Sequence, residues 1–513
     1  MATITPEEET LQAEGPVLDL GVSRPPLPLT DLPTPEAVFD KPKIGRKELV
    51  TCVLGPSMIA LGVSIGSGEW LLGPLGFGVY GFMGLGFLVT ISAILQTCYN
   101  VENARYTIST GEVPIVGFTR VPPGLRLWVP LTLAMIFLAW IWGGWAAAAG
   151  QSLYALFLGR TYDPTVFREA ETVRLIAIGL MCLSFVIYTF GKKIARTMEF
   201  IDTFLVFLIL ITLTVLAIAF APADLWGEML RSIVTPAAVP EGIDATTLGA
   251  IIGYTGFAAG MNFMLINYYR DHGYGMGHKV GFYSGLVGGK KQEVLPTGMT
   301  FSDTDYNASL WKRWFHYLKI DQWGIFFSGA MIGMFVPSVL VVALAVTPGA
   351  EVPTAANMPV YAATELEKHA GWLFPFILIL GALVLFKTQT TILEMLIRNT
   401  TDAAISTSPR LRAWIAGDPR KFYYLLAFSF IVVIGFVIHL TLPTRLLQIS
   451  ANMANLAAMI FPLCLIYLNS KLPKAARAKW YSYVLLIAMV IFFGFFFMNF
   501  LFFQLTGDPL VTF

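Results

Sequence analysis

The chain has 513 residues, of which 56% are apolar and only 13% are charged, and its formal net charge is +1. Soluble domains carry roughly 25% charged residues, so this composition excludes an ordinary soluble protein and indicates a polytopic membrane protein. A net charge so close to zero gives no sign of binding to nucleic acid.

The N-terminal residues 1–48 are predicted to form a disordered cytoplasmic tail. Their first forty residues are rich in Pro, Glu and Thr and poor in hydrophobic residues, a composition typical of disordered segments. They contain no apolar core of a signal peptide. The chain is therefore expected to enter the membrane through its own spans.

Apolar stretches of about twenty residues, each long enough to cross a bilayer as a helix, follow this tail. They lie at 49–72, 76–100, 128–157, 173–190, 200–221, 247–268, 322–346, 372–397, 421–441, 446–469 and 480–505. Lys and Arg concentrate in alternate connecting segments, which predicts a cytoplasmic N-terminus and a C-terminus outside. The sequence thus predicts an all-α integral protein of the plasma membrane with 11 transmembrane helices.

The spans form two groups of five, followed by one more. The predicted units are a first five-helix repeat at 49–221, an extracytoplasmic loop at 222–246, a second repeat at 247–469 that includes the cytoplasmic loop 271–321, and an eleventh helix with the C-terminus at 470–513. The first span starts inside and the sixth starts outside, so the two repeats are predicted to have inverted topology.

Small and polar residues interrupt the leading span of each repeat. Gly66-Ser67-Gly68 is followed at once by Glu69, and Ala258–Asn262 interrupts the sixth span. A helix broken inside the membrane must face protein or a water-filled cavity, and broken helices form the solute and ion sites of secondary transporters. The candidate site residues are Gly66, Ser67, Gly68, Glu69, Ala259, Gly260, Met261 and Asn262. The alternative is that the glycines only allow close helix packing.

Lys387 lies in the middle of the eighth span, where a charge is costly and must face a partner or water. Its predicted partner is Glu69. Lys387 either stands where a coupling cation would bind or pairs with Glu69 in one transport state, and a static ion pair is the alternative. Thr390 is a further candidate in the same segment, whereas Glu394–Arg398 is predicted to be a helix-end ion pair without a functional role.

Asn452 and Asn455 share one face of the tenth span, three residues apart. Their amides are predicted either to ligate a solute or to steer a gating helix. Hydrogen bonding between helices is the alternative. No nucleophile–base pair or metal triad falls at an accessible cleft, so we expect neither an enzyme nor a bound cofactor.

Several motifs resemble the Nramp family of divalent-metal transporters. Gly55-Pro56 followed by Ile65–Trp70 resembles the first span of that family, and Lys387–Thr391 and Gln448–Pro462 resemble its eighth and tenth spans. The tail of the second span, Ala104-Arg105-Tyr106, is similar as well. The resemblance implies a LeuT-like five-plus-five inverted repeat with helices 1 and 6 broken, and alternating access with ion or proton coupling.

The sequence departs from this family at the site itself. The family's metal-binding Asp falls on Gly66, its Asn on Glu69 and its Met on Gly260. A metal site is then expected to use Glu69 and Asn262 with backbone carbonyls and water, a set that suits a hard cation such as Mg²⁺. Alternatively, Glu69 and Lys387 neutralise one another and the cargo is not a metal.

These observations leave three hypotheses. The first is a secondary transporter of a divalent cation with altered selectivity. The second is a cation-coupled transporter of a small non-metal solute. The third is a membrane receptor or scaffold that no longer transports. In each case the lipid bilayer is the expected environment.

Overall fold

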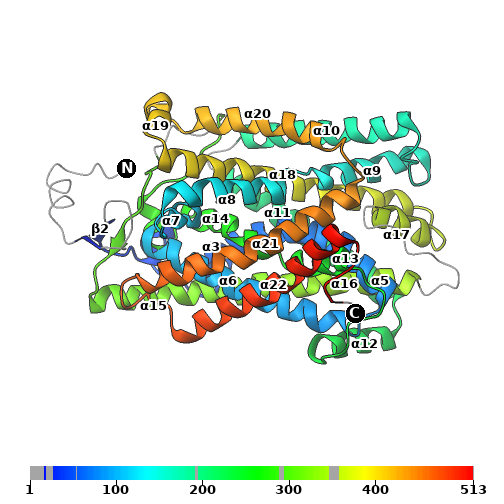
Figure 1. Cartoon of the computed structure of the whole chain (residues 1–513), viewed down its shortest axis with the longest axis horizontal. Helices are drawn as coiled ribbons and strands as arrows, with labels where there is room; N and C mark the ends of the chain where they lie inside the picture. Colours follow the sequence, from blue (N-terminus) through cyan, green and yellow to red (C-terminus); the bar gives the residue numbers. More distant parts are fainter. Residues whose placement is uncertain are drawn as a thin grey trace.

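The computed structural model describes residues 17–18, 27–53, 55–190, 194–287, 294–345 and 357–511. They form an elongated bundle of helices that run roughly along one direction (Figure 1). Within these residues, 9 helices are long and apolar enough to cross a membrane. The all-α membrane class is thereby confirmed, whereas the number of eleven spans stays a prediction.

The helices that build the bundle, listed in chain order, are α4 (Gly55–Ser67), α5 (Gly73–Tyr80), α6 (Leu85–Thr110), α8 (Leu125–Trp140), α9 (Gly144–Leu158), α10 (Phe167–Thr189), α11 (Ile194–Phe220), α13 (Ala245–Gly253), α15 (Asp305–Lys319), α16 (Ser328–Ala345), α18 (Leu373–Thr407), α20 (Arg420–Val437), α21 (Pro443–Ser470) and α22 (Trp480–Thr506). The other helices are α2 (Pro35–Phe39), α3 (Arg46–Val53), α7 (Pro114–Phe118), α12 (Ala223–Val234), α14 (Asn267–Asp271), α17 (Met358–Glu367) and α19 (Pro409–Ile415).

The first span is kinked and then continues as a helix. Ile65 leaves the helical conformation with φ −71° and ψ 70°, and a π-helical turn at Gly68–Leu72 leads into α5. The predicted unwound stretch at 66–69 is therefore wrong in detail, because the kink lies at Ile65. The helix also runs on to Tyr80, beyond the predicted boundary at 72.

The third and sixth spans each contain non-helical residues between two helical segments. α8 and α9 are separated by Ile141–Gly143, and Gly143 has a positive φ of 65°. The sixth span starts at α13, whose N-terminus is capped by Asp244, and it leaves the helix after Gly253. A 3₁₀-helical segment, Ala259–Ile266, follows and leads into α14. The break thus lies at 254–258, four residues before the predicted position.

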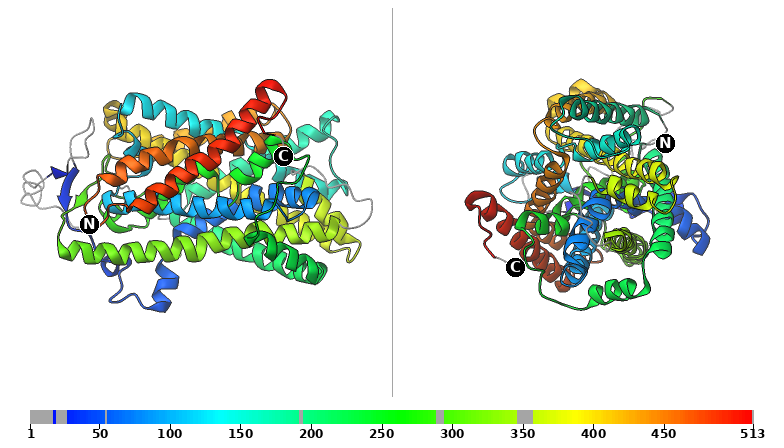
Figure 2. Two further views of the ribbon diagram at one scale, coloured as in Figure 1. Left: turned by 60° about the horizontal axis from the view of Figure 1, so that its bottom comes forward. Right: turned by 90° about the vertical axis from the view of Figure 1, so that its right-hand side faces the viewer.

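The seventh span is one long rod. α15, a π-helical segment at Ile320–Phe327 and α16 follow one another without interruption. Figure 2 shows this rod in yellow-green along the length of the bundle. Thr304 caps its N-terminus, because its side chain accepts a hydrogen bond from the amide of Asn307. The rod therefore joins the predicted cytoplasmic loop to a membrane span.

Part of the predicted disordered tail is ordered and packs on this rod. β2 (Leu27–Thr30) pairs in parallel with β3 (Thr300–Phe301), and β1 (Val17–Leu18) pairs with β2. Trp314 Nε1 donates to the carbonyl of Pro33 over 2.7 Å. The rest of the predicted tail before Leu27 lies outside the described residues. The segment after it differs from the prediction, because apolar and polar partners on α15 fix it.

The two ends of the bundle carry different elements. β2 and α19 lie at one end, and α12 and α17 lie at the opposite end together with the C-terminus (Figure 1). The predicted loop 222–246 contains α12, so it is partly helical.

Candidate functional site

The ammonium group of Lys387 lies on the backbone of the kinked first span. Lys387 Nζ donates hydrogen bonds to the carbonyl oxygens of Gly62 and of Ile65, the latter over 3.1 Å. The kink at Ile65 turns these carbonyls away from the regular helix ladder. Lys387 is 1% exposed, so a built-in cation occupies the oxygens that a kinked membrane helix offers.

Threonines beside Lys387 hold α18 tightly against α4. Thr388 Oγ1 donates to the carbonyls of Gly62 and Val63 at 3.2 and 3.3 Å. A Cβ at Gly66 would lie 2.1 Å from Thr388 Oγ1, so only glycine fits there. The predicted site residue Gly66 thus serves the close approach of the two helices.

Asp202 on α11 completes this cluster. Its carboxylate accepts hydrogen bonds from Thr391 Oγ1 at 3.3 and 3.2 Å, and a Cβ at Gly62 would lie 2.3 Å from its Cγ. Asp202 is fully buried and interacts electrostatically with Lys387. Asp202 is not among the residues predicted from the sequence. The signal for it was a lone carboxylate at the start of an otherwise apolar span.

Glu69 is also buried, but it does not form the predicted pair. Its Oε1 accepts a hydrogen bond from Ser64, and its Oε2 has no hydrogen-bond partner in the described part of the chain. Glu69 interacts electrostatically with Lys387, yet among the described residues no direct ion pair or hydrogen bond joins Glu69 to Lys387 or to Asn262. The side chain of Ser67 lies outside the described residues.

Hydrogen bonds within the break of the sixth span satisfy part of its backbone. Asn262 Oδ1 accepts a hydrogen bond from the amide of Ala258 at 3.3 Å, which leaves Nδ2 without a partner among the described residues. The amide of Met261 bonds the carbonyl of Ala258 at 2.8 Å. Ala259 has φ 39°, a strained value for a residue with a side chain.

Two glycines at the breaks also serve close packing. A Cβ at Gly68 would lie 2.1 Å from the carbonyl oxygen of Tyr254, and a Cβ at Gly260 would lie 1.9 Å from the amide nitrogen of Ala458. In this conformation, Gly68 and Gly260 therefore allow close helix packing, which was the alternative to a role in a binding site. Tyr99 also donates to the carbonyl of Gly260 over 3.1 Å.

Aromatic side chains gather where the third and sixth spans break. The rings of Trp140 and Trp145 stack with centroids 5.7 Å apart, Trp140 contacts Phe257, and Trp145 contacts Tyr254. Gln389 Oε1 accepts from the amide of Ala146 at 3.2 Å, which brings α18 to the same place. The indole N–H groups of both tryptophans and the amide nitrogen of Gln389 are buried and have no partner among the described residues.

The remaining predicted site residues bind neighbouring helices. Thr390 Oγ1 lies 2.7 Å from Ser184 Oγ on α10, a different helix from the first span that Lys387 contacts. Asn452 Nδ2 donates to the carbonyl of Thr246 at 3.0 Å, and Asn455 Nδ2 donates to that of Gly249 at 2.8 Å. Both asparagines therefore join α21 to α13, as the alternative of interhelical hydrogen bonding expected.

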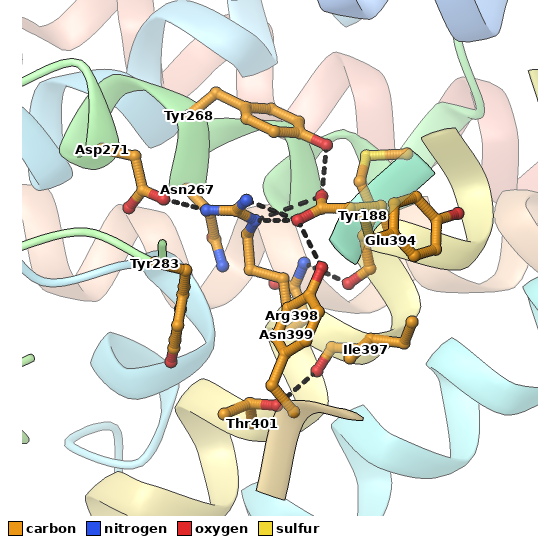
Figure 3. A network of polar contacts seen from close by, with 12 residues as sticks. Tyr188, Asn267, Tyr268, Asp271, Tyr283, Glu394, Ile397, Arg398, Asn399 and Thr401 are labelled. Atoms are coloured by element: carbon orange, nitrogen blue, oxygen red, sulfur yellow. Dashed lines mark hydrogen bonds and ion pairs between the residues drawn. The ribbon is translucent and has the colours of Figure 1, made fainter. Parts of the chain in front are cut away.

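A second buried polar cluster joins the sixth and eighth spans, and we call it the ion network. It consists of Arg270, Asp271, Glu394, Arg398 and Asp402. Figure 3 shows the guanidinium group of Arg398 between Asp271 on one side and Glu394 on the other. Arg270 bonds Asp271 at 2.8 Å and Asp402 at 2.6 Å.

Tyrosines and an amide complete the ion network. Tyr268 and Tyr423 donate to Glu394 at 2.6 and 2.9 Å. Tyr283 and Asn267 donate to Asp402 at 2.8 and 2.7 Å. The predicted ion pair between Glu394 and Arg398 is present, and partners from α14 and α20 also converge on it.

Comparison with solved structures shows which fold this is. The chain is similar to a manganese transporter of Eremococcus coleocola crystallised with an aromatic bis-isothiourea substituted compound, with a TM-score of 0.56 and 14% identity over 90% of this chain and 88% of that one. A mutant of that transporter gives 0.58 and 15% over 90% and 89%.

A third structure belongs to a different transporter family. Mhp1, a nucleobase-cation-symport-1 family transporter in a closed conformation with bromovinylhydantoin bound, gives a TM-score of 0.50 and 11% identity over 86% of this chain and 91% of that one. No family model and no curated protein matches the sequence. The chain therefore has the LeuT-like fold that these transporters share.

Proposed function

We propose that the protein is a LeuT-fold secondary transporter that moves a small non-metal solute. The observation that carries this proposal is the position of Lys387, whose ammonium group donates to the carbonyls of Gly62 and Ile65. A fixed positive charge on these oxygens repels a divalent cation. It also takes the place of an ion that would otherwise bind the kinked helix.

The unpartnered groups at the helix breaks indicate what kind of solute fits. Trp140, Trp145, Gln389 and Asn262 each bury a nitrogen donor without a partner in the described chain. Buried donors are costly unless they are satisfied. The stacked indoles add aromatic surface. The complementary ligand is a small ring compound that carries hydrogen-bond acceptors.

The ligand of one solved structure supports this proposal. Mhp1 was crystallised with bromovinylhydantoin, a planar ring with carbonyl acceptors. The manganese transporter points to the other candidate, a divalent metal. In this chain, the carboxamide oxygen of Asn262 already accepts a hydrogen bond from Ala258, which leaves Glu69 as the one strong oxygen ligand of the predicted metal pair.

Thermal-shift screening of the purified full-length protein tests the proposal. Ligands are hydantoin, nucleobases and small ring carboxylates on one side, and Mn²⁺ and Mg²⁺ on the other. A ligand present at 100 times its dissociation constant stabilises the folded state by about 2.7 kcal/mol. We expect a rise in the unfolding midpoint with at least one ring compound. A rise with Mn²⁺ or Mg²⁺ alone would favour the metal transporter instead.

Matched variants locate the binding. Trp145→Phe keeps the aromatic ring and removes the indole N–H, so affinity should fall by about tenfold, the value of one hydrogen bond. Trp372→Phe makes the same change at a side chain that is 64% exposed, and it should leave affinity unchanged. If binding produces no uptake into proteoliposomes, the receptor hypothesis takes the place of the transporter.

A further inference from the structure

Lys387 and Asp202 are two oppositely charged groups that meet in the core without a direct ion pair among the described residues. Lys387 bonds backbone carbonyls of α4, and Asp202 bonds the hydroxyl of Thr391, one helical turn from Lys387. Lys387 interacts electrostatically with Asp202. Both residues are at most 1% exposed. A proton moved from one of these groups to the other would leave the net charge of the core unchanged.

The other titratable groups around the pair come from four elements. Glu69, in the π-helical turn, also interacts with Lys387. Glu394 lies two turns along α18 from Lys387. Tyr188 on α10 and Tyr268 on α14 interact with Asp202. Both tyrosine hydroxyls donate their hydrogen bonds to α18 and not to Asp202. Asp202 is the carboxylate that faces Lys387 from α11.

A hydrogen-bonded pair, Glu199 and His272, lies one turn along α11 from Asp202. Glu199 lies on the same face of α11 as Asp202, at i and i+3. Its carboxylate is 2.8 Å from His272 Nε2, and it also bonds Arg196, which is 59% exposed. Asp321 of the seventh span interacts electrostatically with His272. The His272 and Glu199 side chains are 7% and 16% exposed, so they reach solvent where Asp202 does not.

We propose that Lys387 and Asp202 form a proton-binding pair that couples solute movement to protons, with Glu199 and His272 as its connection to solvent. The proton leaves Lys387 Nζ, which becomes a neutral amine, and binds an oxygen of Asp202, which becomes a carboxylic acid. The carboxyl proton then passes to the Glu199–His272 pair. The coupling rests on the proposed transport function, whereas proton binding does not.

Loss of the proton from Lys387 would weaken the contact between α18 and the kinked first span. A charged ammonium group makes stronger hydrogen bonds than a neutral amine. When Lys387 loses its charge, its bonds to Gly62 and Ile65 weaken, and the kinked first span is freed from α18. Reprotonation of Lys387 draws the two helices together again. The step thus links a proton to the element that carries the kink.

Infrared difference spectroscopy of the full-length protein in lipid tests the pair without any solute. As pH falls, the carbonyl band of protonated Asp202 should appear, and Asp202→Asn should remove it. In Lys387→Met, the band should appear at a pH that is higher by about one to three units, because the neighbouring positive charge is lost. Asp202→Glu should shift the frequency of the band, which keeps the test valid if Asp202→Asn fails to fold.

Two controls make the same chemical changes elsewhere. Asp224→Asn and Lys312→Met alter exposed residues and should leave the band and its pH midpoint unchanged. A spectrum of Asp202→Asn identical to that of the wild type would overturn the pair, as would an unshifted midpoint in Lys387→Met. Failure of the solute screen with a normal infrared result would overturn the transport proposal alone.

Discussion

At the scale of single residues, the glycines of the first span determine how closely the helices approach. A Cβ at Gly66 would lie 2.1 Å from Thr388 Oγ1. Gly66→Ala should therefore lower stability by about 1–3 kcal/mol, the cost of overpacking. Thermal unfolding of the purified variant measures this. Thr388→Ala in the same chain should recover part of the loss, because it removes the blocking hydroxyl.

A matched glycine shows whether the effect is steric. Gly179 lies in α10, and a Cβ there would meet nothing within 4 Å. Gly179→Ala should leave stability unchanged or slightly increased, since alanine favours the helix. Equal losses for Gly66→Ala and Gly179→Ala would contradict the packing explanation.

Glu112 gives a pH-dependent contribution to stability in the connection between α6 and α8. Its carboxylate bonds Arg120 at 2.5 Å, Tyr106 at 2.7 Å and the amide of Gly298 at 3.0 Å. Burial by itself raises the pKa of Glu112, but the charge and hydrogen bonds of Arg120 outweigh burial, and the net pKa is lowered. The stabilisation is therefore present above the ordinary pKa of a glutamate and is lost as pH falls through the lowered value.

Glu112→Gln should lower stability at neutral pH by about 3–5 kcal/mol, because it leaves Arg120 buried without its charge partner. Unfolding midpoints measured against pH should show the difference between wild type and variant shrinking below about pH 4. Glu228→Gln, at an exposed position of α12, serves as the control. A difference that stays constant down to the lowest pH would argue against the ion pair.

At the scale of elements, the N-terminal segment is held on α15 by aromatic packing. Phe39 contacts the rings of Tyr274 and Trp314 at 5.7 and 5.9 Å. Phe39→Ala should lower stability by about 1–2 kcal/mol, less than a fully buried phenylalanine would. Hydrogen exchange should become faster in residues 30–40. Phe157→Ala, at a side chain that is 84% exposed, should change neither quantity.

Composition and loop charges were enough to predict the helical membrane class, and the motif at Gly55–Trp70 led to the correct fold. The kink position was missed because the helix leaves its regular conformation at Ile65, one residue before the glycines on which the prediction was based. Asp202 was missed because its importance comes from the close approach of Gly62, a contact across two spans. Contacts of this kind, between segments far apart in the sequence, cannot be predicted from a local sequence pattern.

At the scale of the whole molecule, the ion network closes the bundle between the sixth and eighth spans. Arg270 and Arg398 face three carboxylates in a region where the network side chains are at most 5% exposed. Breaking a buried pair costs several kcal/mol. If the sixth and eighth spans move apart at the ion network, these ion pairs have to separate. The ion network therefore stabilises the closed conformation.

Arg398→Met should therefore favour opening at this end. A cysteine placed at Met264, whose carbonyl contacts Asn399, reports access in a background without other cysteines. Its labelling by a water-soluble thiol reagent should become at least about tenfold faster, equivalent to about 1.4 kcal/mol. Arg160→Met breaks an ion pair with Glu169 outside the network and should not change the rate. Equal rates in both variants would exclude the network as a lock.

The uninterrupted seventh span is a long rigid helix, so a small tilt at one point moves its far end by a larger distance. Its 40 residues from Asp305 to Leu344 measure about 60 Å at about 1.5 Å per residue, roughly twice the hydrocarbon thickness of a bilayer. Gly329 is one of its close contacts with the first span, since a Cβ there would lie 2.4 Å from Leu61. If Gly329 is the fulcrum, a tilt of about 10° moves Asp305 by about 6 Å. A tilt of this size about the contact with the first span thus becomes a displacement that a spin label at Tyr306 would register.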